Sequence, residues 1–215
     1  MIKMQIEFFH DVLCAFCYAL SPRLHRLVAE HPEVEVVHRG FALARTPDHL
    51  AQMFGSPEVA KAEILHHWQV AAQNDDQHRP RPAAMQAQPF PYPHSWPGLL
   101  ACQAAELQGG QAAHWAMFDR VQYAHLTETR DITDLEVLAS CAREVGLDEP
   151  RWRADFADPA TAARLEQDLN LAQAYGITGV PTLVAEGHYG LVGAQPYDRL
   201  EVWLQAVEQK LQEEK

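Results

Sequence analysis

The sequence is poor in positive charge and has no long hydrophobic run. Its 17 Lys and Arg residues are outnumbered by 29 Asp and Glu residues, so the formal net charge is −12. Nucleic-acid-binding proteins normally present a basic face, and this balance argues against nucleic acid as a partner. The N-terminal segment has no apolar run as long as a signal peptide or a membrane span requires. We therefore expect no membrane association and a cytoplasmic location.

Cysteine is also scarce, with four residues among 215. A chain of this length can bury a sufficient hydrophobic core, so it needs no framework of structural disulfides. Two of the four, Cys14 and Cys17, have the CxxC spacing, which in a cytoplasmic protein is typical of redox catalysis or of a metal site. Cys102 and Cys141 fall in segments predicted to be helical. We interpret them as small buried residues rather than as a second dithiol.

The pattern of apolar residues predicts an α/β fold that is interrupted by helices. Residues 3–9 and 33–39 are expected to be strands on either side of a helix, and this order is typical of a parallel strand pair. No strand is predicted between 46 and 155, where a proline-rich stretch is expected to be irregular. The helices expected in this middle part span residues 57–75, 98–108, 111–125, 133–146 and 150–156.

The C-terminal part returns to an α/β pattern. A helix is predicted from 159 to 175, a hairpin from 182 to 192 and a last helix from 196. We therefore predict a domain formed by residues 1–45 and 156–215. Residues 46–155 are predicted to form an all-helical domain inserted into it.

The CxxC pair lies where a predicted strand ends and a helix begins. The first cysteine then lies at the helix N-terminus, beside unpaired N–H groups and the positive end of the helix dipole, which favour a thiolate. We assign Cys14 as the nucleophile and Cys17, one turn further, as the buried thiol that resolves the mixed disulfide. Ala15 and Phe16 between them carry no polar group, which predicts a less oxidising potential than that of strong oxidants.

The same pair could form half of a zinc site. Such a site needs two further ligands at typical spacing. None of the 12 histidines forms an HxxxH pair near the motif, and the sequence has no second CxxC. We therefore expect no metal site.

Three segments of the chain resemble those of a known family. They are the segments DVLCAFCY at 11–18, GITGVPT at 176–182 and YGLVGAQP at 189–196. With Pro22 in the helix after the motif, they resemble thioredoxin-fold proteins of the DsbA family, and within it the FrnE-like branch. The resemblance implies a thioredoxin-like fold with an all-helical domain inserted between the βαβ half and the cis-proline and hairpin half. Branch members often carry Pro-Trp between the cysteines, where this chain has Ala-Phe.

The resemblance also implies roles for residues near the motif. In the family, the residue that matches Pro181 is a cis-proline beside the cysteines. Val180 would then offer its backbone N–H and C=O to an extended substrate.

Other candidates come from the residues themselves. A buried carboxylate could accept the proton of Cys17, and Glu7 and Asp11 lie on or just after the strand that leads to the motif. The aromatic side chains Phe16, Trp96 and Trp115 are candidates to line a substrate groove.

The sequence thus predicts a thiol–disulfide oxidoreductase whose partners are disulfide or dithiol substrates, with proteins expected first. We expect no cofactor besides the redox-active disulfide, with glutathione as a candidate co-substrate. One alternative is a glutathione-dependent isomerase of the kappa or 2-hydroxychromene-2-carboxylate type, but those enzymes carry serine where Cys14 stands. A second alternative is a non-enzymatic module that binds a partner or a metal. The redox direction and the oligomeric state are not predicted.

Overall fold

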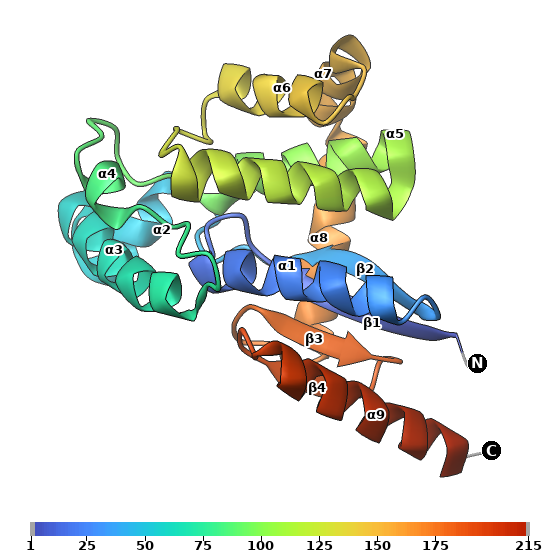
Figure 1. Ribbon diagram of the computed structural model, residues 1–215. Helices are drawn as coiled ribbons and strands as arrows, with labels where there is room; N and C mark the ends of the chain where they lie inside the picture. Colours follow the sequence, from blue (N-terminus) through green and yellow to red (C-terminus); the bar gives the residue numbers. More distant parts are fainter. Residues whose placement is uncertain (1–2, 214–215) are drawn as a thin grey trace.

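A four-stranded sheet with the order β2-β1-β3-β4 forms the centre of the computed structural model, which describes residues 3–213 (Figure 1). β1 (Met4–His10) pairs in parallel with β2 (Val34–Gly40). On its other side β1 pairs antiparallel with β3 (Thr182–Ala185), which forms a hairpin with β4 (Tyr189–Val192). The predicted strands at both ends of the chain are therefore present and lie in one sheet.

The helices follow β1 along the chain and separate or follow the other strands. Those next to strands of the sheet are α1 (Ala15–Glu30), α8 (Pro159–Ala174) and α9 (Tyr197–Glu213). Between β2 and α8 the described chain contains helices and no strand. These helices are α2 (Pro47–Phe54), α3 (Pro57–Asn74), α4 (Pro82–Gln86), α5 (Ser95–Gln122), the π-helix η1 (Tyr123–Thr127), α6 (Leu135–Glu144) and α7 (Glu149–Ala157).

The alternation of side chains along β1 decides which helices meet which face of the sheet. Phe8 belongs to the large apolar core that includes Leu20 of α1 and Leu204 of α9. Phe9 points the opposite way and packs in a smaller cluster with Ala172 of α8. In Figure 1, α1 and α9 accordingly lie in front of the sheet and α8 lies behind it.

The middle helices differ from the prediction at α2, which was not expected, and in the proline-rich stretch. The predicted break between the helices at 98–108 and 111–125 is present within α5, where Gly109 (φ −138°, ψ 20°) and Gly110 (φ 63°) leave the helical geometry. The proline-rich stretch was predicted to be irregular, but it contains the short helix α4. Its proline at the first helical position is compatible with a helix because the missing N–H would be unpaired there.

The helical segment shares one buried core with the sheet. Phe118 of α5 packs edge-on against Phe8 of β1, with ring centroids 5.8 Å apart. The same apolar cluster extends to Trp152 of α7. The separation into domains at residues 45 and 155 stays a prediction. No helix among residues 3–213 is long and apolar enough to cross a membrane.

Trp152 joins α7 to α5 and gives a test of this core. Its side chain is fully buried, and its Nε1–H donates to the carbonyl oxygen of Ala101 at 3.1 Å. We expect Trp152→Ala to lower the free energy of unfolding by ~3–5 kcal/mol, because it leaves a large cavity. Val202→Ala, at a side chain that is 58% exposed, is the control and should change it by less than ~0.5 kcal/mol. Urea denaturation measures both, and equal effects would contradict the expectation.

Candidate active site

Cys14 caps the N-terminus of α1. Its backbone is extended (φ −79°, ψ 106°), and its Sγ accepts a hydrogen bond from the backbone N–H of Cys17 at 3.3 Å. The Cys14 thiol donates to the carbonyl oxygen of Val180, with the two atoms 3.5 Å apart. Cys14 keeps 7% of its surface exposed and Cys17 none. The pair therefore consists of an outer thiol that a substrate can reach and an inner thiol that it cannot.

The inner thiol is held in its protonated form. Burial raises the pKa of Cys17 well above its ordinary value, and the neighbouring Cys14 raises it further. A hydrogen bond from the backbone of Asp11 lowers the pKa of Cys17, while the charge of the Asp11 carboxylate raises it. Because only a thiolate attacks a disulfide, Cys17 needs a proton acceptor before it can react.

Asp11 is a fully buried carboxylate beside this thiol. One oxygen accepts from the backbone N–H of Leu13 at 3.0 Å. The other accepts from the backbone N–H of Leu43 and from the Ser95 hydroxyl, both at 2.6 Å. Burial raises the pKa of Asp11 to about 6, although these hydrogen bonds lower it. Near neutral pH the carboxylate is therefore ionised and still basic enough to accept a proton.

Glu7, the other candidate proton acceptor, points to the opposite face of the sheet. Its Oε1 pairs with the guanidinium of Arg39 at 2.8 Å, and its Oε2 accepts from the hydroxyl of Tyr175 at 2.9 Å. Side chains alternate along a strand, so Glu7 shares the α8 face with Phe9, while α1 packs on the other face. The structure therefore favours Asp11 over Glu7 as the acceptor.

Gln122 at the end of α5 fixes the loop before the cysteines. Its side-chain amide donates to the carbonyl oxygens of Asp11, Val12 and Cys14, at 3.2, 3.4 and 2.9 Å. The sequence analysis missed this residue. No local pattern marks it, because it lies in the middle of the chain and far from the motif that it contacts.

An apolar groove opens beside Cys14. This cavity of about 300 Å³ lies between the motif and helices α2 and α3. Its lining residues are Leu13, Cys14, Ala15, Phe16, Leu43, Ala44, Leu50, Met53, Phe54, Ile64, His67, Trp68, Tyr92 and Val180. None of these side chains is a carboxylate, a lysine or an arginine, so the groove suits apolar substrate groups.

Of the three aromatic residues predicted to line a groove, the structure places only Phe16 there. Trp115 instead donates its Nε1–H to Ser21 at 2.8 Å and stacks on His25, which holds it against the middle of α1. Trp96 lies under the guanidinium of Arg45, 4.6 Å from its ring centre. Trp96 and Trp115 are thus occupied with other side chains outside the groove.

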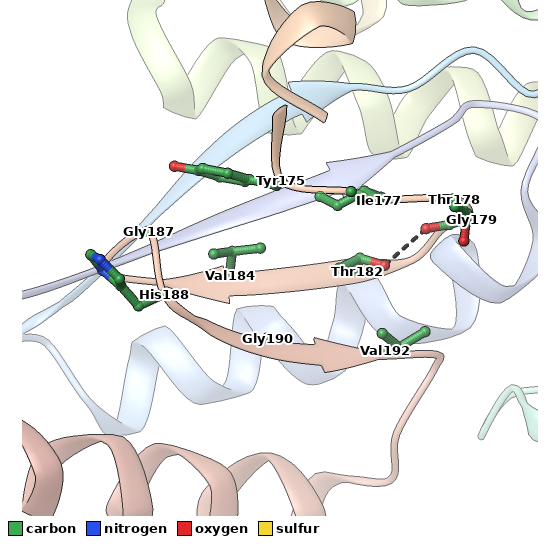
Figure 2. A pocket seen from close by; sticks show the side chains of 11 residues that line it. Tyr175, Ile177, Thr178, Gly179, Thr182, Val184, Gly187, His188, Gly190 and Val192 are labelled. Carbon is green, nitrogen blue, oxygen red and sulfur yellow. Dashed lines mark hydrogen bonds between the residues drawn. The ribbon is translucent and has the colours of Figure 1, made fainter. Parts of the chain in front are cut away.

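The segment before β3 connects the site to the hairpin. The Val180–Pro181 peptide bond is cis. Thr182 donates its hydroxyl to the carbonyl oxygen of Gly179 at 2.8 Å, and Figure 2 shows this bond. A second cavity, of about 500 Å³, lies along Tyr175 to Gly179 and the hairpin. Its lining contains neither a cysteine nor a carboxylate, so it is separate from the dithiol chemistry (Figure 2).

The two cysteines outside the CxxC motif lie away from the groove. Cys102 and Cys141 are fully buried free thiols in α5 and α6. Burial raises the pKa of both, so neither is a reactive thiolate. His67 is the only histidine in the lining of the groove.

Comparison with known proteins identifies the fold. A family model described as the DSBA-like thioredoxin domain matches residues 5–205. The cytosolic disulfide reductase DsbM from Pseudomonas aeruginosa superposes with a TM-score of 0.73 at 24% identity, covering 97% of this chain and 98% of that one. A 2-hydroxychromene-2-carboxylate isomerase has a TM-score of 0.65 at 19% identity, with 98% and 97% covered. The predicted thioredoxin-like fold is thereby confirmed.

A curated relative shares sequence over much of the chain. The ClpXP adapter protein SpxH from Shouchella clausii is 26% identical over 184 residues, which are 84% of this chain. The chain spans 57% of the length of that relative and 58% of a second SpxH, from Halalkalibacterium halodurans.

The pH dependence of mixed-disulfide resolution distinguishes Asp11 from Glu7 as the proton acceptor. With an oxidised substrate peptide, the mixed disulfide on Cys14 should resolve faster as the pH rises through about 6, because Asp11 then loses its proton and can accept that of Cys17. We expect Asp11→Asn to remove this inflection and to slow resolution by at least about 100-fold. Single-turnover stopped-flow kinetics measure the rate. Glu7→Gln is the matched control, and an inflection lost there but kept in Asp11→Asn would reverse the assignment.

Proposed function

We propose that this chain, which belongs to the family of DSBA-like thioredoxin domains and is a thiol–disulfide oxidoreductase, reduces protein disulfides with Cys14 and Cys17. The observation that carries the proposal is the position of the Cys14 sulfur. It caps α1, contacts Val180 and borders the apolar groove, while Cys17 lies buried one turn behind it. An outer nucleophile and an inner resolving thiol are what a two-step thiol–disulfide exchange requires.

The reaction proceeds in two exchanges. The Cys14 thiolate attacks one sulfur of the substrate disulfide, so a Cys14–substrate disulfide forms and the other substrate sulfur leaves as a thiolate, which takes up a proton. Cys17 then passes its proton to Asp11 and attacks Cys14 Sγ, which releases the second substrate thiol. The substrate gains two electrons, and the chain is left with a Cys14–Cys17 disulfide.

Regeneration needs an external thiol. Two thiols of a small-molecule donor reduce the Cys14–Cys17 disulfide and are themselves oxidised to a disulfide. Glutathione, the candidate co-substrate from the sequence, belongs to this class. The groove offers no cationic side chain for its carboxylates, so we assign the groove to the protein substrate.

The residues between the cysteines support reduction as the direction. A CxxC protein is strongly oxidising when its reduced form is stabilised. Here Ala15 and Phe16 contribute no polar side chain, and the backbone N–H of Cys17 is the donor bonded to the Cys14 sulfur. The dithiol is therefore less stabilised than in a strong oxidant, which makes it a better reductant. The similar P. aeruginosa protein, described as a cytosolic disulfide reductase, supports this direction and a cytoplasmic location.

The groove defines the preferred substrate. Val180, next to Cys14, can pair its backbone with an extended peptide as an added strand would. Apolar side chains of that peptide would then enter the groove between Leu50, Ile64 and Trp68. We therefore propose unfolded or extended protein segments with apolar residues beside a cysteine as the substrates.

The dithiol assignment is tested with insulin and dithiothreitol. We expect the chain to accelerate insulin reduction and Cys14→Ser to return the rate to that of dithiothreitol alone, because the attacking sulfur is gone. Cys17→Ser should accumulate a mixed disulfide at Cys14, seen by mass spectrometry. Cys102→Ala is the matched control and should keep the parent rate. A folded parent with no activity would instead favour the glutathione-dependent isomerase or the binding-module alternative.

A negative charge placed in the groove tests whether the groove binds apolar parts of the substrate. Met53 of α2 lines the groove and is 58% exposed. We expect Met53→Glu to lower kcat/KM for a disulfide peptide with apolar flanks about fivefold, because roughly 1 kcal/mol of apolar contact is lost. Reduction of a small aromatic disulfide should change little. Val59→Glu, on α3 outside the lining and 48% exposed, is the control. Equal losses in both variants would remove the groove from substrate binding.

A further inference from the structure

Three buried histidines gather on the α5 side of β1. His10 ends β1, His38 lies on β2 and His114 lies on α5. Each is at most 1% exposed, and their ring centroids are 5.0 to 5.3 Å apart. One ring nitrogen from each lies within 4.8 Å of the other two. These residues, here called the histidine cluster, come from separate elements that only the folded chain brings together.

Most nitrogens of the histidine cluster have no hydrogen-bond partner within residues 3–213. Both ring nitrogens of His10 and of His38, and Nε2 of His114, are buried and unpaired. A buried polar atom without a partner costs folding free energy, and folded proteins contain few of them. Each neutral ring has one lone pair to offer, so a shared ligand could accept one nitrogen from each of the three histidines.

The described side chains that pack on these rings are themselves aromatic. The ring of Phe118 packs on His10 with centroids 4.0 Å apart, and Phe8 and Trp115 pack on His38 at 5.5 and 5.0 Å. These aromatic walls exclude bulk solvent.

One histidine already has the outer partner typical of a metal ligand. Nδ1 of His114 is hydrogen-bonded to Glu106 Oε2 at 2.7 Å, and Glu106 also accepts from Arg164 at 2.6 Å. An imidazole that donates from Nδ1 has its lone pair on Nε2, and Nε2 of His114 is buried and unpaired among the described residues. Carboxylates orient metal-bound histidines in this way.

We propose that the histidine cluster binds one divalent transition-metal ion, with zinc the ion that fits it best. Imidazole ligands suit zinc, whereas magnesium and calcium prefer oxygen. Zn–N bonds of ~2.0–2.1 Å place tetrahedral ligands ~3.3–3.4 Å apart, so small side-chain rotations close the site. Three histidines leave the fourth position of a tetrahedral zinc ion to a water molecule. The ion clamps β1, β2 and α5 together, because each of these elements supplies one ligand. The proposal differs from the expectation of no metal site, which rested on spacing along the sequence.

The test must separate the histidine cluster from the CxxC thiols, which can themselves bind zinc. The parent is therefore the full chain with Cys14→Ser and Cys17→Ser, stripped with a chelator. Cobalt(II) is titrated in first and followed by its visible absorption, and zinc then displaces it. We expect one equivalent to bind with the spectrum of a nitrogen-ligated tetrahedral ion, and added zinc to raise the Tm.

Variants assign the ligands. In this background, His38→Gln and His114→Gln should each weaken zinc binding at least about 100-fold, and Glu106→Gln about tenfold through its effect on His114. His125→Gln, at a buried histidine outside the cluster, is the matched control and should bind as the parent does. Circular dichroism checks that each variant is folded.

Two results would overturn the proposal. One is a folded parent that binds no stoichiometric cobalt or zinc. The other is binding that survives both His38→Gln and His114→Gln unchanged, since the metal would then lie elsewhere. If either histidine variant fails to fold, Glu106→Gln and the cobalt spectrum of the parent decide, because a spectrum without nitrogen-ligated tetrahedral bands contradicts the site.

Discussion

The buried carboxylate of Asp11 is the constraint on which the rest of the site depends. Its two oxygens bind the backbone of Leu13 before the cysteines, the backbone of Leu43 after β2, and the hydroxyl of Ser95 at the start of α5. Ser95 in turn accepts from the backbone N–H of Ala44. Three segments that are far apart in the sequence therefore meet at one charge. The first two of these segments also line the groove, through Leu13, Leu43 and Ala44.

Burying the Asp11 carboxylate lowers folding stability near neutral pH, and the same burial lets Asp11 exchange a proton. The pKa of Asp11 in the folded chain is about 6, above the ordinary value, so its contribution to stability is greatest at low pH, where it is protonated. That contribution is lost as the pH rises from about 4 through about 6, on the order of 3 kcal/mol. A carboxylate tuned purely for stability would have a lowered pKa. The raised pKa is what lets the same group exchange a proton with a thiol.

The sequence predicts the features that depend on local order. The CxxC at a strand-to-helix junction, the parallel β1–β2 pair and the C-terminal hairpin each follow from neighbouring residues. Alternation along β1 could also have excluded Glu7, since it shares a face with Phe9. The roles of Gln122 and Ser95 could not be predicted, because each depends on where α5 crosses the end of β1. Trp96 and Trp115 were misplaced because an aromatic residue packs equally well in a groove or against a polar neighbour.

One face of α5 connects the redox motif with the histidine cluster. His114, Phe118 and Gln122 recur every four residues, so they lie along one stripe of the helix. His114 meets His10, Phe118 packs on the same imidazole, and Gln122 binds the carbonyl of Cys14. The register of this stripe against the end of β1 thus sets both the spacing of the histidines and the position of the Cys14 loop. An ion bound by the cluster would fix that register and would hold the loop in place without touching either sulfur.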